Sequence, residues 1–330
     1  MDQQARRGGD GLPGAGGDER GRAVETVIRA RSLVKRYGDF TAVDGIDLDV
    51  PPGESFGLLG PNGAGKSSTM RMIGGVSRRT SGELTVLGLD PDVDGPAVRA
   101  GLGVVPQDDT LDSELTVRDN LRVYGRYFGL SRAECRERAE RLLAFAHLEE
   151  RAGAKVEEIS GGMRRRLTIA RALISDPHVL LLDEPTTGLD PQARNLLWDR
   201  LFRLKEQGTT LILTTHYMDE AEQLCDRIVV VDQGRIMAEG SPAQLIREHV
   251  SREVVELRFG REHNAEVARR IEGVGDRVEV LVDRVVVFAD DGEAVLEHVA
   301  REGLHPVTSL VRRASLEDVF LRLTGRSLIE

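Results

Sequence analysis

Apolar residues recur with two different periods along the chain, and this change predicts strands that alternate with helices. The segments VIRARSLVKRY (27–37) and GIDLDV (45–50) alternate between apolar and polar residues, as half-buried strands do. HVLLLDEP (178–185) and TTLILTTH (209–216) are apolar runs of strand length, and the helix-like PQARNLLWDRLFRLKEQG (191–208) separates them. Such alternation indicates an α/β fold in which helices pack on a mostly parallel sheet.

The pattern changes again around residues 247–252, where the density of charged residues rises. From there to residue 311 the predicted order is β-α-β-β-α-β, which is that of a ferredoxin-like split unit. We therefore expect residues 250–330 to form a small C-terminal α+β domain. Its predicted elements are a strand at 254–259, a helix at 265–272, strands at 278–282 and 285–288, a helix at 293–301, a strand at about 307–311 and a helix at 316–323.

Two other segments have simpler patterns. Residues 1–24 are rich in glycine and charge and contain almost no large apolar residues, so we expect a disordered tail that cannot bury enough surface to fold. Residues 110–158 are mostly helical in period, as in VRDNLRVYGRYFG (117–129) and RAECRERAERLLAFAHL (132–148).

Composition narrows the possible partners. A chain of 330 residues is long enough for about two domains. Its formal net charge of −10 argues against nucleic acid as the main partner, because phosphate binding favours basic surfaces. Cys135 and Cys225 have no metal-binding spacing, so we expect two reduced, packed cysteines. No apolar run approaches the roughly 18 residues of a membrane span, and no signal peptide is evident, so another chain must provide any membrane anchor.

The stretch GLLGPNGAGKSST (57–69) fits the pattern G-x-x-x-x-G-K-[ST] between a buried strand and a helix. Glycines let backbone N–H groups approach an anion, and the start of the following helix adds partial positive charge. The alternative, a glycine-rich turn with an incidental lysine, requires both the match and its strand–helix context to be coincidental. Lysine can reach the β- and γ-phosphates of a nucleotide, and serine offers a hydroxyl to Mg²⁺. The residues predicted to bind nucleotide here are Gly60, Pro61, Asn62, Gly63, Ala64, Gly65, Lys66, Ser67 and Ser68.

Two adjacent carboxylates follow the apolar run HVLLL. The carboxyl end of a parallel strand faces the ligand crevice, so Asp183 is placed to hold Mg²⁺ directly or through water. Glu184 can orient and deprotonate an attacking water. An isolated acidic pair at a strand end is usually just solvated. Here the glycine-rich loop at residues 60–67, a P-loop, favours the catalytic interpretation.

A third motif is ISGGM, which opens another helix. Ser160 and the amides of Gly161 and Gly162 would make an anion-binding helix start. The alternative is an N-cap serine followed by flexible glycines.

These three motifs, in this order, resemble the nucleotide-binding subunit of ABC transporters over residues 26 to about 245. The resemblance assigns adenine stacking to Tyr37 and the sensing of Mg²⁺ and attacking water to Gln107. It places Asp190 at a dimer seam and His216 against the γ-phosphate. Each of these residues alone has an ordinary structural explanation. Their occurrence together, in the order of the family's motifs, supports the roles that the resemblance assigns.

The resemblance also implies an architecture and partners. Within residues 26–246 it implies a P-loop ATPase core with a helical subdomain at about 108–163 and an antiparallel β subdomain. It implies a homodimer with two ATP molecules at its seam, each held by one subunit's P-loop and the other subunit's Ser160–Gly162. Hydrolysis of ATP with Mg²⁺ would drive a separate integral membrane permease, with this subunit on the cytoplasmic, inner face of a bacterial cell membrane.

Several segments resemble one branch of this family, the drug-resistance and nodulation-factor-type exporters. They are SGGMRRRL (160–167), ARNLLWD (193–199), THYMDEAEQLCDRI (215–228) and SLEDVFLRLTGR (315–326). A drug-like, lipid or glycan cargo would follow. An amphipathic helix that packs on the small domain also explains residues 315–326, and both interpretations can hold. Met163 stands where the family commonly has glutamine, and its thioether cannot donate the amide's hydrogen bonds, so any ribose or inter-subunit contact of that side chain is in doubt.

Other points stay open at this stage. The run 164–166 (RRR) raises the field near bound phosphate or is a solvated helix face. Tyr124, Tyr127 and Phe128 form a permease surface or pack in a core. Residues 250–330 are expected to be a dimer-stabilising or regulatory module.

Two other functional classes compete with transport. ABC-type ATPases of DNA repair or translation usually have two nucleotide domains, long insertions or zinc cysteines, whereas this chain has one P-loop and two isolated cysteines. A nucleotide-dependent protein that binds ligand without transporting it is barely excluded by the sequence.

Overall fold

The computed structural model describes residues 26–260 and 264–325, so the predicted tail at 1–24 lies outside the described residues. Its centre is a six-stranded sheet in which five neighbouring strands are parallel and the sixth, at one edge, is antiparallel. The central strands are almost wholly buried, as their continuous apolar sequences require when a sheet is covered on both faces. In sheet order the strands are β5 (Leu102–Val105), β6 (Val179–Asp183), β7 (Thr210–Thr215), β3 (Ser55–Leu59), β8 (Arg227–Asp232) and β9 (Arg235–Gly240).

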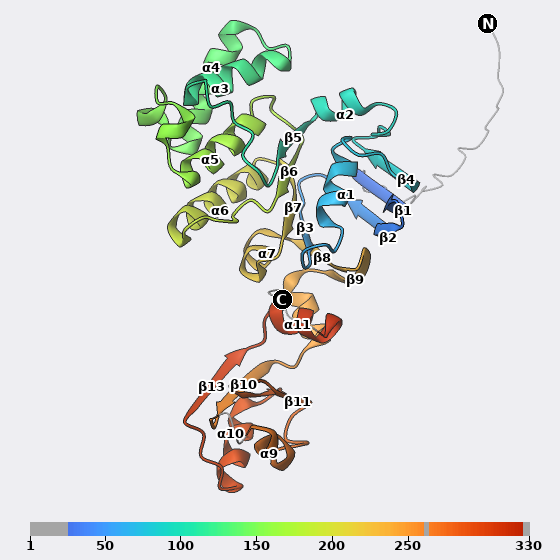
Figure 1. Cartoon of the computed structure of the whole chain (residues 1–330), viewed down its shortest axis with the longest axis vertical. Coiled ribbons are helices and arrows are strands. Elements are labelled where there is room, and N and C mark those ends of the chain that lie inside the picture. The colour runs from blue at the N-terminus through green and yellow to red at the C-terminus, as the bar shows by residue number, and fades with distance from the viewer. Residues whose placement is uncertain (1–25, 261–263, 326–330) are drawn as a thin grey trace, which may run out of the picture.

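One face of this sheet packs on α1 (Lys66–Ile73) and on a three-stranded antiparallel sheet (Figure 1). That second sheet has the order β2 (Phe40–Val50), β1 (Ile28–Tyr37) and β4 (Ser81–Val86). Its apolar side chains and those of α1 form one core with the large sheet. Periodicity did not predict β4, β5 or the short α2 (Gly95–Ala100), which are too short to show a clear period.

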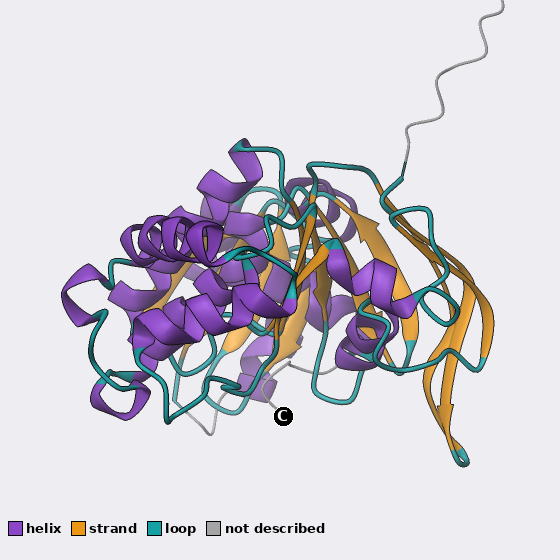
Figure 2. Ribbon diagram, turned by 90° about the horizontal axis from the view of Figure 1, so that it is seen from above, coloured by secondary structure: helices purple, strands orange, loops and turns teal. Residues whose placement is uncertain are grey.

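The opposite face of the large sheet is covered by helices (Figure 2). These are α5 (Gly161–Ala172), α6 (Pro191–Glu206), α7 (Met218–Leu224) and α8 (Pro242–His249). A separate helical block, α3 (Val117–Tyr127) and α4 (Arg132–Ala146), packs on α5 with two short 3₁₀ turns and its own apolar core. The predicted α/β fold with a helical block and an antiparallel β sheet is confirmed.

The C-terminal sheet has the order β11 (Arg277–Val280), β12 (Val285–Ala289), β10 (Glu253–Arg258) and β13 (Thr308–Arg313), and all its pairings are antiparallel. Helices α9 (Asn264–Arg270) and α10 (Gly292–Arg301) cover one face of it. The predicted β-α-β-β-α-β order and its ferredoxin-like connections are therefore confirmed.

The helix that follows this sheet, α11 (Leu316–Thr324), does not use its apolar face to cover it. Leu316, Val319 and Phe320 are fully buried in the core that lies behind the six-stranded sheet, against α7 and α8. The backbone N–H of Leu316 also donates to Glu222 Oε1 of α7 at 2.9 Å. Of the alternatives left open for residues 315–326, packing on the small domain does not describe the apolar face of this helix, because that face completes a core formed much earlier in the chain.

A ladder of ion pairs joins the C-terminal sheet to α11. Glu256 lies between two arginines, 3.1 Å from Arg284 Nη1 and 3.0 Å from Arg312 Nε. Arg312 also binds both carboxylate oxygens of Asp318 on α11, at 2.7 Å and 2.9 Å. Burial raises the pKa of Asp318, but these charge-assisted hydrogen bonds outweigh it and the pKa falls below its usual value.

Two expectations from composition can be compared with the structure. Cys135 and Cys225 are buried and free, as predicted. Within the described ranges, none of the helices has both the length and the apolar character needed to cross a bilayer.

Candidate functional site

The P-loop joins the buried strand β3 to the first turn of α1. Gly65 has φ +102°, and a Cβ there would lie 2.3 Å from the Ala42 carbonyl oxygen, so only glycine fits. Lys66 begins α1 and is 4% exposed, and its Nζ donates to the Gly60 and Pro61 carbonyls at 2.7 Å and 3.1 Å. Burial lowers the pKa of Lys66, while the carboxylates of strand β6 act in the opposite direction.

A cavity of about 380 Å³ opens over this loop. Tyr37 and Phe40 line it from the β1–β2 hairpin, where they face each other as the last register pair. Phe40 is 60% exposed, which is unusual for so large an apolar side chain at a hairpin end. Sequence reasoning missed Phe40, although an aromatic residue three positions from Tyr37 was a usable signal. The other lining residues are Ala42, Asn62, Gly63, Ala64, Gly65, Lys66, Ser67, Ser68, Gln107 and Glu184.

Tyr37 lies beside the helix that follows the P-loop. Burial alone would raise the pKa of its phenol, but hydrogen bonds with Ser68 and Ser77 and the charges of Lys35 and Arg71 lower it. The Lys35 ammonium lies 4.7 Å from the ring centroid. The ring is 44% exposed at the mouth of the cavity, so one face remains open to a planar ligand.

Glu184 is the centre of a group of polar side chains at the carboxyl ends of the parallel strands. Its Oε1 lies 3.1 Å from His216 Nδ1 and 3.9 Å from Lys66 Nζ. Its Oε2 accepts hydrogen bonds from Gln107 Nε2 at 3.2 Å and Thr187 Oγ1 at 3.3 Å. The structure therefore brings together four residues predicted from separate motifs, and adds Thr187, which the sequence did not reveal.

Asp183 ends β6 next to the P-loop serine. Its Oδ1 accepts a hydrogen bond from Ser67 Oγ at 3.2 Å and another from Thr214 Oγ1 on the neighbouring strand β7. Thr214 also holds the Glu184 backbone, since its hydroxyl and carbonyl oxygens both lie 3.1 Å from the Glu184 nitrogen. Sequence reasoning missed Thr214, because a threonine inside an apolar strand carries no distinguishing pattern.

The residues of the ISGGM motif, here called the signature residues, lie elsewhere in the same chain. Ser160 caps α5 by accepting a hydrogen bond from the Met163 backbone at 3.3 Å. Gly161 lines a second hollow, of about 330 Å³, together with Gln107, Thr187 and residues of α5. Among the described residues that line the P-loop cavity, none comes from Ser160–Gly162. Gln107 lines both hollows, whereas Gly161 lines only the second.

Comparisons with known proteins agree with this arrangement. A family model described as ABC transporter matches residues 43–187, and one described as Nodulation factor export protein NodI, C-terminal domain, matches residues 259–325. Nod factor export ATP-binding protein I of Cupriavidus metallidurans is 48% identical over 317 residues, which cover 92% of this chain and 99% of that protein. The protein of the same name from Rhizobium meliloti is 50% identical and covers 93% of this chain and 90% of its own length. This chain belongs to the ATP-binding subunits of ABC transporters.

Solved structures place this ATP-binding subunit among the same cassettes. A dimeric ATP-binding cassette in a post-hydrolysis state, bound to ADP and Pi, has a TM-score of 0.60 and 29% identity over 65% of this chain and 98% of its own. The protein cbiO1 from Clostridium perfringens, part of an ABC transporter complex, has a TM-score of 0.63 and 29% identity over 68% of this chain and 91% of its own. The match to the NodI C-terminal domain and the two relatives place the ATP-binding subunit in the nodulation-factor-type exporter branch, and its ABC domain hydrolyses ATP in support of transport.

The remaining motif residues of the ATP-binding subunit have clear local roles. Met163 packs on the core of the helical block, which explains why an apolar thioether is accommodated where an amide is common. Asp190 caps α6, because its Oδ1 accepts from the Ala193 backbone at 2.8 Å. Of the arginine run, Arg165 is only 9% exposed, so the alternative of a solvated helix face does not hold for that residue.

The exposed ring of Tyr37 gives a direct test of the adenine assignment. Tyr37→Ala is expected to weaken ATP binding by roughly 1–3 kcal/mol, by analogy with base–aromatic stacking. Tyr37→Phe keeps the ring and should bind nearly as well as wild type. Titration with a fluorescent ATP analogue measures both, and equal affinity of the alanine variant and wild type would reject the stacking role.

Proposed function

We propose that two copies of this chain form a head-to-tail dimer with two ATP molecules at its seam. The observation that carries the proposal is that none of the described residues lining the P-loop cavity comes from Ser160–Gly162 of the same chain, although Gln107 lines both hollows. Tyr37, Lys66 and His216 would hold ATP from one subunit, and Ser160–Gly162 would approach its γ-phosphate from the other, near Asp190. Bound ATP then favours the closed dimer, and hydrolysis removes the contact that holds it closed.

Mg²⁺ fits the donors at this site. The Ser67 hydroxyl and the Asp183 carboxylate lie 3.2 Å apart, and both are oxygen ligands of the kind Mg²⁺ takes with nucleotide phosphates and water. Gln107, which donates to Oε2 of Glu184, is the third residue predicted to contact Mg²⁺. When bound, Mg²⁺ would neutralise charge on the phosphate oxygens.

The polar groups around Glu184 have separable roles in the proposed reaction. Glu184 orients the attacking water and takes its proton, because its carboxylate is held from four sides at the mouth of the P-loop. Lys66 supplies positive charge to the phosphate oxygens, for which it exchanges its present contacts with loop carbonyls. Gln107 and His216 both contact the Glu184 carboxylate. Gln107 would sense Mg²⁺ and the attacking water, and His216 would contact the γ-phosphate.

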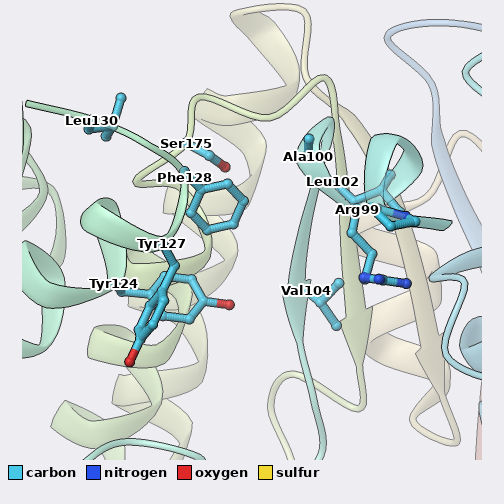
Figure 3. Close-up of a pocket in the computed structure, with 10 residues that line it drawn as sticks. Arg99, Ala100, Leu102, Val104, Tyr124, Tyr127, Phe128, Leu130 and Ser175 are labelled. Atoms are coloured by element: carbon cyan, nitrogen blue, oxygen red, sulfur yellow. The ribbon is translucent and has the colours of Figure 1, made fainter. Parts of the chain in front are cut away.

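A groove between α3 and the edge of the large sheet is the proposed docking surface for the permease. It has a volume of about 550 Å³, and aromatic side chains at the end of α3 face Val104 of the edge strand β5 and Arg99 of α2 across it (Figure 3). Tyr124 and Phe128 also pack on the helical core, so core packing accounts for part of their burial. Tyr127 is 80% exposed and lacks that explanation. An amphipathic segment of a membrane protein would cover this apolar surface.

The cargo is proposed from the relatives alone. Their names assign them to Nod factor export, so we infer a cargo of that type, a lipid- or glycan-like compound that the permease recognises. The ATP-binding subunit would then work at the inner face of the cell membrane, attached through its partner.

Affinity capture of the full chain from solubilised membranes, with and without ATP, tests this function. A multi-span membrane protein in stoichiometric amount is expected. Tyr127→Ala should reduce its recovery about tenfold or more, as loss of an interface anchor does. Phe202→Ala, at another exposed aromatic outside the groove (48% exposed), should not. Recovery with ribosomes, with DNA or with no partner would instead favour the two competing classes.

A further inference from the structure

One arginine of the signature helix α5 faces inward and contacts the catalytic strand. Arg165 is 9% exposed, and its N–H groups donate to backbone carbonyls of residues 183–185 and 106–107. A guanidinium has five N–H donors in a fixed plane. All the acceptors of Arg165 are main-chain oxygens, so its hydrogen bonds depend on the path of the backbone and not on the side chains of these residues. The donor–acceptor distances are 2.8 Å to Pro185, 2.9 Å to Asp183, 3.0 Å to Glu184 and 3.4 Å to Gln107, and Pro106 accepts a further bond.

The backbone at the centre of these bonds is strained. Glu184 has φ +45°, in the left-handed region that non-glycine residues rarely adopt. Such a conformation persists only where the surrounding structure fixes it from several sides. Thr214 fixes the nitrogen of Glu184, while Arg165 fixes its carbonyl and those on either side. The orientation of the Glu184 carboxylate therefore depends on a residue of α5.

A second buried ionisable group, the carboxyl of Glu220, acts on the charge of Arg165. Glu220 of α7 is 0% exposed, and its carboxylate and the guanidinium act on each other electrostatically. Burial lowers the pKa of Arg165 and raises that of Glu220, and each charge opposes the effect on the other. The guanidinium stays protonated in any case. Thr186, Thr215 and Trp198 are the polar groups around Glu220, so this carboxyl lies among the loop after β6, the end of β7 and α6.

The same helix begins with the signature serine. Ser160 and its glycines form the N-terminus of α5, and Arg165 follows within the next turn and a half. We propose that Arg165 is a positioning residue that fixes the backbone of the catalytic base to the signature helix, and so links turnover at one nucleotide site to engagement of α5 at the other. The linkage rests on the proposed dimer, whereas the positioning of Glu184 does not.

The test compares steady-state ATP hydrolysis by the full chain in four variants. Arg165→Gln removes the charge and most donors, and Arg165→Lys keeps the charge with three donors in place of a planar fork. Glu220→Gln replaces the buried carboxyl of α7 with an amide. Arg166→Gln is the matched control, because Arg166 lies on the same helix and also donates to carbonyls, but to Ala146 and His147 of the helical block.

We expect kcat to fall about 10²-fold in Arg165→Gln, the cost of a small misplacement of a catalytic group. KM and the affinity for a fluorescent ATP analogue should stay within about twofold, and the Hill coefficient for ATP should fall towards 1. Arg165→Lys and Glu220→Gln should also lower kcat while KM stays unchanged, with smaller losses. Either of them tests the proposal if Arg165→Gln does not fold. Arg166→Gln should keep the wild-type kcat and Hill coefficient.

Three results would overturn the proposal. Unchanged kcat in both Arg165 variants removes the positioning role. Equal losses in Arg165→Gln and Arg166→Gln reduce it to general support of the helix. Loss of nucleotide affinity in step with kcat shows an effect on binding instead. Wild-type hydrolysis without cooperativity would reject the dimer and with it the linkage, while the split between kcat and KM still decides whether Arg165 positions Glu184.

Discussion

Replacement of Glu184 by glutamine is expected to leave ATP binding intact while turnover falls by about 10²–10⁴-fold, the usual contribution of a general base. The amide has the same shape and can still accept from Gln107 and Thr187, so the surrounding geometry should persist. It cannot take a proton from water. ATP should then accumulate unhydrolysed, and dimers should become detectable by size-exclusion chromatography in ATP.

The control for this variant is Glu140→Gln, which makes the same chemical change at a surface ion pair of α4. It should hydrolyse ATP at the wild-type rate. Undiminished turnover in Glu184→Gln would remove Glu184 from the role of base. Loss of ATP binding would show that the carboxylate serves mainly to hold Lys66 in place.

Truncation of a single C-terminal side chain should destabilise the ATPase core. Phe320 of α11 is 1% exposed, and it packs in the core behind the six-stranded sheet. Phe320→Ala is expected to lower the free energy of unfolding of that core by about 3–5 kcal/mol, as for other buried phenylalanines. Denaturant titration, followed by a signal from bound nucleotide, measures the loss.

Val307→Ala is the control, since Val307 is 80% exposed in the same C-terminal region and should change stability little. An unchanged midpoint in Phe320→Ala would mean that α11 is detached in solution. The same contact bears on a test of the expected regulatory module, in which the chain would be truncated at residue 246. That cut removes the C-terminal sheet and also opens the core that α11 covers, so loss of activity would not by itself reveal a regulatory role for the sheet.

Much of the fold followed from the sequence for a physical reason. Strands covered on both faces must be continuously apolar, so β6 and β7 were visible, and a helix of sixteen residues such as α6 shows its period clearly. The P-loop and the acidic pair were also visible, because the chemistry requires particular residues at fixed spacing.

Other features could not be derived in this way. The amphipathic pattern of α11 shows that one face is buried but does not say which sheet or helix lies against it. Arg165 stands in a run of three arginines, and charge alone does not distinguish a side chain that extends into solvent from one that binds five carbonyls. Thr214 belongs to the site through the pairing of β6 with β7, which brings together residues far apart in the chain.

The position of α11 also has a consequence for synthesis on the ribosome. The core behind the large sheet stays open until Leu316, Val319 and Phe320 have emerged, which happens only after the whole C-terminal sheet has been made. At roughly 5–20 residues per second, that interval is on the order of ten seconds. During it the apolar surfaces of α7 and α8 are exposed to chaperones and to other nascent chains. A subunit interrupted before α11 would therefore be prone to aggregation and degradation.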